Sequence, residues 1–410
     1  MPAESLKCKE CSTAYPLEAR YVCERCFGPL EVAYRPHTSD APALKRRIQA
    51  GPHTLWRYAD FLPLEGPARS ALPTGWTPLV RAHRLAERLG LREVWIKNET
   101  ANPTHSFKDR VVSVALARAL ELGVDTVACA STGNLAGAVA AHAAAAGLPA
   151  YVFVPADLEP EKILSAGAYG ARILGVRGTY DDVNRLCTEI SGERESWAFV
   201  NVNMRPYYAE GSKTLAFETA EQLGWELPDR VVAPVASGSL FTKVARGFQE
   251  WIDAGLLDGD LPAMHGAQAL GCSPVAQAFA AGTDVCRPVK PDTIAKSLAI
   301  GNPADGPYAV DLARRTGGSV ESVTDDEIRA GIRLLAETTG IFTETAGGVT
   351  TAVLAKLAES GAIDPDERVV AYITGDGLKT LDAVRDSVEV TAIEPRLEAF
   401  EAVETQEVVA

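Results

Sequence analysis

The stretch Asn102-Pro-Thr-His-Ser-Phe-Lys-Asp-Arg110 is the part of the chain from which the fold can best be inferred. It follows a short apolar run, Val94–Lys97, whose composition predicts a strand, and it opens a helical run from Val111 to Leu120. The pair Asn102-Pro103 is a turn signal, because the residue before a proline avoids the α region. A strand, a turn and a helix in this order indicate the start of a βαβ unit and therefore an α/β fold.

The helix start gives one side chain in this stretch a special position. Ser106 and Asp109 are three residues apart and fit a capping box, so we expect the helix to begin at Phe107. Lys108 then lies in the first turn, among unpaired backbone N–H groups and the positive end of the helix dipole. This position predicts a lowered pKa for the Lys108 amine, as a Schiff-base lysine needs. The plain alternative is a solvated surface lysine.

Composition limits the partners of the chain. Its 410 residues have a mass of 43.6 kDa, a net charge of −14 and a pI of about 5.0, and they suffice for about two to three domains. An acidic surface repels phosphate groups, so we expect no nucleic-acid partner and no membrane partner. The sequence has neither a long apolar run nor a secretory signal pattern, so the cytoplasm is the expected location.

Four of the eight cysteines form two closely spaced pairs near the start of the chain. Cys8 and Cys11 are separated by two residues, as are Cys23 and Cys26, with eleven residues between the pairs. Four thiolates at this spacing are typical of a tetrahedral zinc site without an open position, so we predict a structural zinc-ribbon-like segment over residues 1–34. The alternatives are two Cys-x-x-Cys turns that bind no metal, and a site that binds iron. The remaining cysteines are scattered, as reduced buried thiols are.

The rest of the chain alternates apolar, β-rich runs with helical patterns. Most of these runs precede a helix, so we predict parallel sheets covered by helices on both faces. We expect residues 35–75 to be a linker packed on the body, residues 76–390 to hold two α/β subdomains, the smaller at roughly 105–215, and residues 391–410 to be an acidic tail. The predicted strands are Val94–Lys97, Thr126–Ala130, Ala150–Val154, Ala171–Val176, Ala198–Asn201, Arg230–Val235, His265–Ala269 and Val369–Thr374.

We expect four further stretches with small or polar residues to lie just after strands. In open α/β sheets, ligands bind at the carboxyl ends of the strands, and helix N-termini bind anions. Read alone, each stretch is also compatible with an ordinary capped helix start. The stretches are Ser131-Thr-Gly-Asn134, Ala236-Ser-Gly-Ser-Leu-Phe-Thr242, Phe342-Thr-Glu-Thr-Ala-Gly-Gly348 and Thr374-Gly-Asp-Gly-Leu-Lys379.

The wording around Lys108 resembles the lysine motif of the fold-type II pyridoxal-phosphate (PLP) enzymes, N-P-[ST]-G-S-[FY]-K-x-R. His105 departs from this motif, because it stands where the family usually has glycine. The phrase Gly75-Trp-Thr-Pro-Leu79 resembles the G-x-T-P-L phrase that the family has before the lysine, and the resemblance extends over residues 75–385. The positions that match the lysine motif are Asn102, Pro103, Thr104, Ser106, Phe107, Lys108 and Arg110.

This resemblance implies a fold of two α/β subdomains and a role for each loop. It makes Lys108 the lysine that holds PLP as a Schiff base and moves protons during catalysis, with Phe107 beside it. Asn134 is then the partner of the ring hydroxyl, and Thr374 is the partner of the pyridine nitrogen. The family's loop along the cofactor ring corresponds to the stretch with Glu344. The substrate carboxylate is assigned to Ser131, Thr132 and Gly133, and the cofactor phosphate to Ala236, Ser237, Gly238, Ser239 and Leu240.

Two phrases are closest to the threonine synthases within this family. They are the G-x-G-L-K wording at 375–379 and the E-G-x-K-T wording at 210–214. The resemblance implies conversion of O-phospho-L-homoserine and water into L-threonine and phosphate, with Asn203 and Arg205 as candidates for binding the substrate phosphate. We also expect a homodimer. The alternatives are a threonine or serine dehydratase, a cysteate-synthase-like enzyme, and a non-catalytic regulator that binds a partner through the zinc ribbon.

Overall fold

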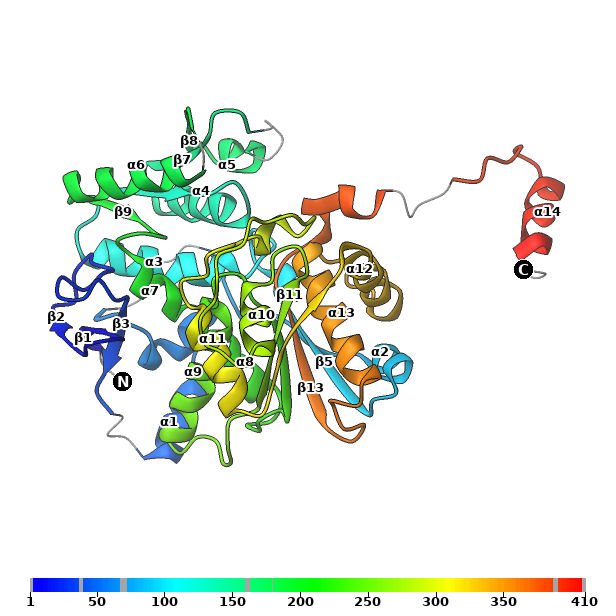
Figure 1. Cartoon of the computed structure of the whole chain (residues 1–410), viewed down its shortest axis with the longest axis horizontal. Helices are drawn as coiled ribbons and strands as arrows, with labels where there is room; N and C mark the ends of the chain where they lie inside the picture. Colours follow the sequence, from blue (N-terminus) through cyan, green and yellow to red (C-terminus); the bar gives the residue numbers. More distant parts are fainter. Residues whose placement is uncertain are drawn as a thin grey trace.

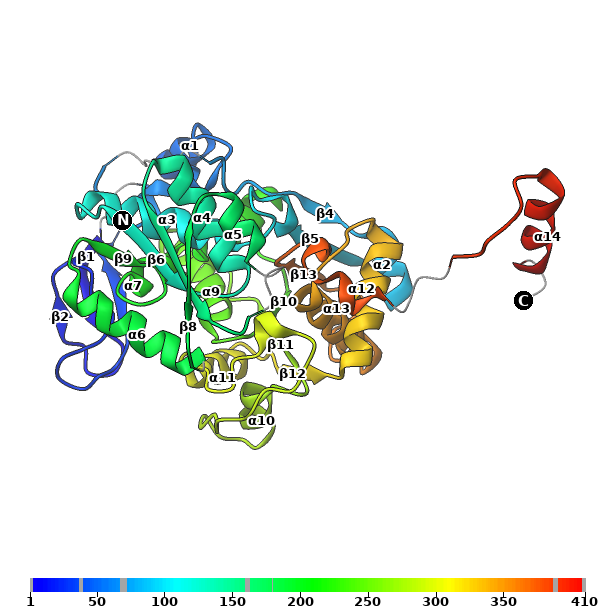
Figure 2. The ribbon, with the colours of Figure 1, turned by 90° about the horizontal axis from the view of Figure 1, so that it is seen from above.

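The computed structural model describes residues 3–36, 40–66, 72–158, 163–178, 180–385 and 390–407, and within them the chain forms three sheets. Figure 1 shows a larger α/β body below, a smaller one above it and a small N-terminal sheet at their side. Figure 2, the view from above, separates the N-terminal sheet from the helices of the larger body. Parts of the predicted linker and tail, residues 37–39, 67–71 and 408–410, lie outside the described residues.

The larger body is built on a six-stranded sheet with the order β12-β11-β10-β13-β5-β4. Its strand pairs are parallel, except that β4 runs antiparallel to β5 at one edge. The central strands β10 and β13 are buried along nearly their whole length, as expected for a sheet covered on both faces. The strands are β4 (Leu79–Arg81), β5 (Glu93–Asn98), β10 (Arg230–Pro234), β11 (Ala263–Ala269), β12 (Val320–Val323) and β13 (Arg368–Ile373).

Two groups of helices cover this sheet and give it two separate hydrophobic cores. Residues 40–66 belong to the first group, since α1 and the 3₁₀ helix η1 (Leu55–Phe61) bury Leu44, Ile48, Tyr58 and Phe61 there. The first group also contains α8, α9, α10 and α11. The helices of the first face are α1 (Ala41–Gln49), α8 (Lys213–Gln222), α9 (Ser239–Asp253), α10 (Pro274–Ala280) and α11 (Gly306–Arg315); those of the second are α2 (His83–Leu89), α12 (Asp325–Thr339) and α13 (Thr345–Glu359).

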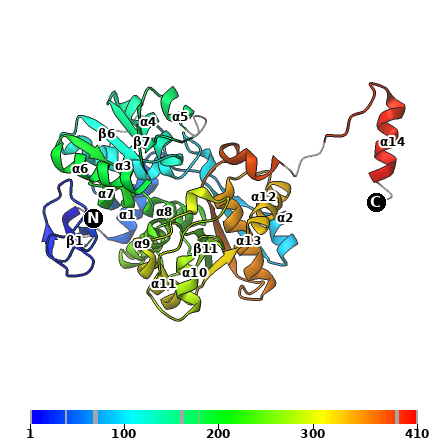
Figure 3. The same ribbon diagram turned by 45° about the horizontal axis from the view of Figure 1, so that its top comes forward.

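The smaller body contains a four-stranded parallel sheet with the order β8-β7-β6-β9. Helices α3, α4, α5 and α7 pack on one side of it and α6 on the other. Figure 3 shows this body standing over the larger one. The elements are α3 (Lys108–Glu121), β6 (Thr126–Ala130), α4 (Asn134–Ala146), β7 (Ala150–Pro155), α5 (Leu164–Ala168), β8 (Arg172–Val176), α6 (Tyr180–Glu193), β9 (Trp197–Phe199) and α7 (Arg205–Glu210).

The N-terminal sheet is antiparallel with the order β2-β1-β3, and it packs against the smaller body. Leu6, Leu30 and Val32 are buried in the same hydrophobic cluster as α3 and α7. At the other end of the chain, α14 (Leu397–Glu407) lies well apart from both bodies (Figure 1). In the described part of the chain, no helix has both the length and the apolar character needed to cross a membrane. The three N-terminal strands are β1 (Ala3–Cys8), β2 (Ala14–Tyr15) and β3 (Leu30–Tyr34).

The eight strands predicted from the sequence are all present, with ends that differ by at most about two residues, which is the usual uncertainty. The sequence analysis missed the three N-terminal strands and the short edge strands β4 and β12. The stretch at 342–348 was expected after a strand, but it follows helix α12. The predicted mixture of parallel sheets and covering helices is confirmed. Comparison with solved structures, given below, supports the same fold.

Candidate active site

The loop before Lys108 is held against the end of β13 by backbone contacts. The amide of Phe107 donates to the carbonyl of Thr374 at 3.0 Å, and the amide of Asp376 donates to the carbonyl of His105 at 3.1 Å. His105 has a φ of 62°, a conformation that suits glycine best, which explains why the family usually has glycine here. The departure at His105 therefore leaves the loop shape intact, and Lys108 becomes the first residue of α3.

The predicted capping box of α3 is wrong. The N-cap residue is Phe107, and it has no side-chain cap. The Asp109 carboxylate instead accepts from the backbone amide and the hydroxyl of Thr104, each at 2.9 Å, and from Nε2 of His142 at 2.9 Å. Asp109 is fully buried, so its interaction with the preceding loop and with α4 outweighs the local sequence pattern. It fixes the loop that presents Lys108.

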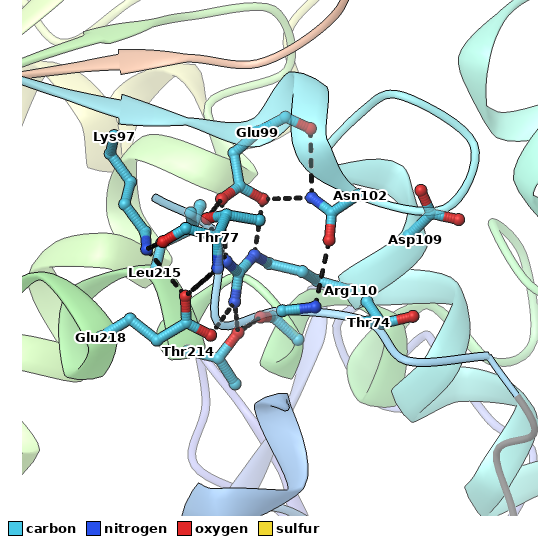
Figure 4. A network of polar contacts seen from close by, with 12 residues as sticks. Thr74, Thr77, Lys97, Glu99, Asn102, Asp109, Arg110, Thr214, Leu215 and Glu218 are labelled. Carbon is cyan, nitrogen blue, oxygen red and sulfur yellow. Dashed lines mark hydrogen bonds and ion pairs between the residues drawn. The ribbon is translucent and has the colours of Figure 1, made fainter. Parts of the chain in front are cut away.

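Arg110 is the centre of a buried network of charges beneath the lysine loop (Figure 4). Its guanidinium donates to both carboxylate oxygens of Glu99, at 2.6 and 2.8 Å, and to both of Glu218, at 2.6 and 2.7 Å. Lys97 donates to Glu218 at 2.8 Å, and all four side chains are fully buried. Two positive and two negative charges therefore balance in the interior. The network joins β5, the segment after it, α3 and α8.

The same network explains the G-x-T-P-L phrase. The amide of Trp76 donates to Glu218 at 2.7 Å, and the Thr77 hydroxyl donates to Glu99 at 2.5 Å and accepts from Arg110 at 3.0 Å. This phrase is far from Lys108 in sequence but supplies the second layer of contacts around its loop. It supports the site and does not itself line it.

Asn134, at the first turn of α4, is held between two charged side chains of the larger body. Its amide nitrogen donates to both oxygens of Glu344 at 3.0 Å, and its amide oxygen accepts from Lys379 at 2.8 Å. Burial raises the pKa of Glu344 and lowers the pKa of Lys379. Lys379 also donates to the carbonyl of Thr104 at 2.5 Å, in the lysine loop. Three of the stretches singled out in the sequence thus meet at Asn134.

The loop after β10 turns sharply into α9 at Gly238. Gly238 has a φ of 96°, and a Cβ there would lie 2.7 Å from the carbonyl oxygen of Asp305, so only glycine fits. The helix starts at Ser239 without a side-chain cap at Gly238, and a helix start of this kind offers backbone N–H groups that can bind an anion. The Asp305 amide donates to the carbonyl of Ser237 at 2.8 Å, and its carboxylate accepts from Arg205 at 2.9 Å.

The stretch before E-G-x-K-T is largely structural. Asn203 has both polar side-chain atoms bonded to backbone, accepting from Phe199 at 2.8 Å and donating to Trp197 at 3.0 Å. This pairing argues against a direct contact between Asn203 and a substrate, whereas Arg205 is about one-third exposed. Lys213 is fully buried in ion pairs, at 2.6 Å from Glu210 and 2.9 Å from Glu250.

Sequence reasoning missed three residues of the site. Tyr208 lies between Arg205 and the E-G-x-K-T wording at 210–214, and its hydroxyl is 2.9 Å from the Lys108 amine. Lys379 ends the quoted phrase 374–379 but was given no role. Asp305 contacts both the loop at 236–242 and Arg205, and it lies in a segment without any motif. A tyrosine or an aspartate with no neighbouring pattern gives no signal in one sequence.

The candidate substrate-carboxylate loop lies open. Ser131 and Thr132 are half-buried, Gly133 is exposed, and a Cβ built on Gly133 would meet no atom within 4 Å. The Ser131 hydroxyl accepts from the amide of Gly133 at 3.4 Å. Thr374 is buried at the end of β13, opposite this loop. The carboxyl ends of strands from two sheets therefore face one another across the site.

The four paired cysteines form a compact cluster with two similar halves. Their sulfur atoms all lie within 4.8 Å of one another. In each half, the residue after the second cysteine has a positive φ, 59° at Ser12 and 58° at Phe27, and its amide donates to the carbonyl of the first cysteine at 3.0 Å. Sulfur ligands at about 2.3 Å from a tetrahedral zinc ion would be separated by about 3.8 Å, which this cluster can match.

The residues around Lys108 fit PLP. The cofactor needs a lysine amine, an anion site for its phosphate and hydrogen-bond partners for its ring, and this site offers Lys108, the uncapped start of α9, and Asn134 with Thr374. The Thr345 hydroxyl, beside Glu344, is buried without a hydrogen-bond partner in the described structure, as a side chain near an absent group often is. Fold and site together define a fold-type II PLP enzyme.

Comparison with known proteins agrees with this class. Residues 71–375 match the family model described as pyridoxal-phosphate dependent enzyme. A threonine synthase from Methanocaldococcus jannaschii is 39% identical over 95% of this chain and 96% of its own length, and one from Mycobacterium bovis is 34% identical over 84% and 94%. The chain belongs to the pyridoxal-phosphate dependent enzymes and, within them, to the threonine synthase family.

Solved structures of the same fold carry other activities. Threonine deaminase isoform 2 from Solanum lycopersicum has a TM-score of 0.65 at 23% identity, covering 86% of this chain and 90% of its own. Maize serine racemase has a TM-score of 0.64 at 20% identity, covering 86% and 97%. At such identities the likeness shows the fold alone.

Proposed function

We propose that the chain is a threonine synthase that converts O-phospho-L-homoserine and water into L-threonine and phosphate. The observation that carries the proposal is the match of relatives named threonine synthase over 95% or more of the chain, at 38–39% identity. The arrangement of Lys108, Asn134 and Thr374 at facing strand ends supports it.

Each group of residues in the site has a separate role in this reaction. PLP, when bound, supplies the electron sink that makes the protons at Cα and Cβ of the substrate removable. Lys108 would hold the cofactor, and its Nζ would carry protons to and from the substrate. The open loop 131–133 receives the substrate carboxylate at the N-terminus of α4, and the start of α9 receives the cofactor phosphate. Thr374, whose hydroxyl carries no charge, meets the pyridine nitrogen.

A comparative assay tests this function. Purified protein with PLP should release phosphate from O-phospho-L-homoserine and form threonine, and should form far less 2-oxobutyrate from threonine or pyruvate from serine. The dehydratase alternative predicts the reverse ratio. A protein that binds PLP but acts on none of these substrates would favour the regulator.

Arg205→Ala is expected to raise KM for O-phospho-L-homoserine by about 10- to 100-fold, because one charge-assisted contact to phosphate contributes roughly 1.5–3 kcal/mol. Arg205 is partly exposed, pairs with Asp305 and lies three residues before Tyr208 on the same helix face, so it is a candidate for the phosphate of the substrate. The measurement is steady-state kinetics with phosphorylated and unphosphorylated amino acids.

Two comparisons make this prediction specific. Arg315, which is half-exposed and ion-paired with Asp311, is a matched control, and Arg315→Ala should leave KM unchanged. An equal effect of Arg205→Ala on phosphorylated and unphosphorylated substrates would place Arg205 outside the phosphate subsite.

We also propose that the cysteine cluster holds one structural zinc ion. Four cysteine ligands leave no open coordination position, and a sheet of three short strands has too small a core to fold unaided.

Replacing Cys8 and Cys11 by serine should reduce bound zinc from about one ion per chain to none, as measured by elemental analysis. Cys286→Ser, which changes a cysteine outside the cluster, should retain the metal. Wild-type protein that carries no metal when prepared without chelators would contradict the proposal.

The remaining expectations concern partners and location. We propose a cytoplasmic homodimer without nucleic-acid partners, on the grounds of the net charge of −14 and of the biosynthetic role. Sedimentation analysis and fractionation of cells test the assembly state and the location.

A further inference from the structure

Tyr208 on α7 lies in contact with the reactive lysine. Its hydroxyl oxygen is 2.9 Å from Nζ of Lys108, and its ring centroid is 5.6 Å from the same atom. The Phe107 ring is a second neighbour of the amine, with its centroid at 4.5 Å. None of the roles assigned above uses Tyr208.

The surroundings of Lys108, which is half-buried, differ from those of the buried lysines. Lys97, Lys213 and Lys243 are each bonded to a glutamate, at 2.8, 2.9 and 2.8 Å. A carboxylate at that distance stabilises the ammonium form. Within the described residues Lys108 has no ion pair, and a phenol takes the place of the carboxylate. A hydroxyl can donate to a neutral amine and accept from an ammonium, so it suits both protonation states.

The helix that carries Tyr208 is firmly fixed. The neighbouring hydroxyl of Tyr207 donates to the carbonyl of Glu18 at 2.9 Å, which ties α7 to the N-terminal sheet. At the end of α7, Glu210 accepts from Tyr34 at 2.6 Å and from Lys243 at 2.8 Å. A Cβ on Gly211 would lie 2.5 Å from the carbonyl oxygen of Arg110, so α7 and α3 are in close contact. The Tyr208 hydroxyl is therefore held in a defined place relative to Lys108.

From this geometry we infer that Tyr208 is a catalytic residue. Its hydroxyl is hydrogen-bonded to the free amine of Lys108, whether that amine is neutral or protonated, and keeps it pointing in one direction. The inference rests on the proposed function, because it concerns the amine that carries protons there. No bond is made or broken at Tyr208. Its hydroxyl donates when Nζ is neutral and accepts when Nζ is protonated.

Tyr208→Phe and Tyr207→Phe form a matched pair of variants that each lose one hydroxyl on the same helix. We expect Tyr208→Phe to keep its cofactor, to keep KM within about threefold and to lose about 100-fold in kcat, because the amine that transfers protons is no longer held in one direction. The midpoint of the pH titration of the visible absorption band should shift by about one unit relative to wild type. Tyr207→Phe should leave kcat and the titration unchanged, because its hydroxyl bonds the Glu18 carbonyl.

The spectral titration needs no substrate, so it separates this inference from the proposed function. If the wild type releases no phosphate from O-phospho-L-homoserine, the proposed function fails, while the titration still tests the contact with Lys108. The inference is overturned if Tyr208→Phe keeps kcat within about threefold and titrates as wild type does, or if its kcat falls only in proportion to its cofactor content.

Discussion

Lys108→Ala protein is expected to lack the visible absorption band of the wild type and to turn over at least about 1,000-fold more slowly. The substitution removes the amine that holds the cofactor and also the group that carries protons, so both functions are lost together. PLP should still bind without a covalent link, because the start of α9 and the side chains of Asn134 and Thr374 remain. Absorption spectra, cofactor content and kcat are the measurements.

Borohydride reduction followed by peptide mapping identifies the lysine that carries the cofactor. The pyridoxyl group should be found on Lys108. Lys379 is a competing lysine, because its amine lies in the same site, but it is bonded to Asn134 and to the Thr104 carbonyl. Lys213 is fully buried between two glutamates. Modification of Lys379 or Lys213 would contradict the assignment, and Lys290→Ala, at an exposed position, is the control that should keep colour and activity.

The lysine loop, the strands and the loops after them could be predicted from the sequence because each has a local cause. Buried strands such as β6 and β10 are short apolar runs, and Asn134 and Ser239 follow them in stretches of small and polar residues. The start of α3 at Lys108 was predicted within one residue, although for the wrong reason. The prediction relied on a capping box between Ser106 and Asp109. Asp109 instead binds Thr104 and His142.

The contacts between distant segments could not be predicted. Glu218 sits in the middle of α8 with no motif around it, yet it binds Arg110, Lys97 and the loop that contains Trp76. The sequence analysis chose Arg205 as the candidate in this region, whereas the hydroxyl of Tyr208, one turn further along the same helix, contacts Lys108. Such pairings depend on how α7 and α8 pack against α3, and one sequence shows only their local patterns.

Arg110→Met is expected to lower the stability of the protein by roughly 3–5 kcal/mol, because it leaves buried carboxylates without their main partner. Glu99 and Glu218 are fully buried, and each makes two bonds to the guanidinium. Arg185→Met is a matched control, since Arg185 is also paired with two carboxylates but is 65% exposed, and it should leave the midpoint of unfolding unchanged. The midpoint of denaturant unfolding measures both.

The dependence of this loss on pH distinguishes a charge effect from a packing effect. Burial raises the pKa of Glu218, but the charges of Arg110 and Lys97 outweigh burial and lower it to about 2. A carboxylate with a lowered folded pKa stabilises the protein above its unfolded pKa of about 4.3, and this stabilisation is lost as the pH falls toward 2. The difference between wild type and Arg110→Met should therefore be largest near pH 7 and shrink below about pH 4. A difference that stays constant from pH 7 into this acid range would mean that Arg110 stabilises the interior through its volume rather than its charge.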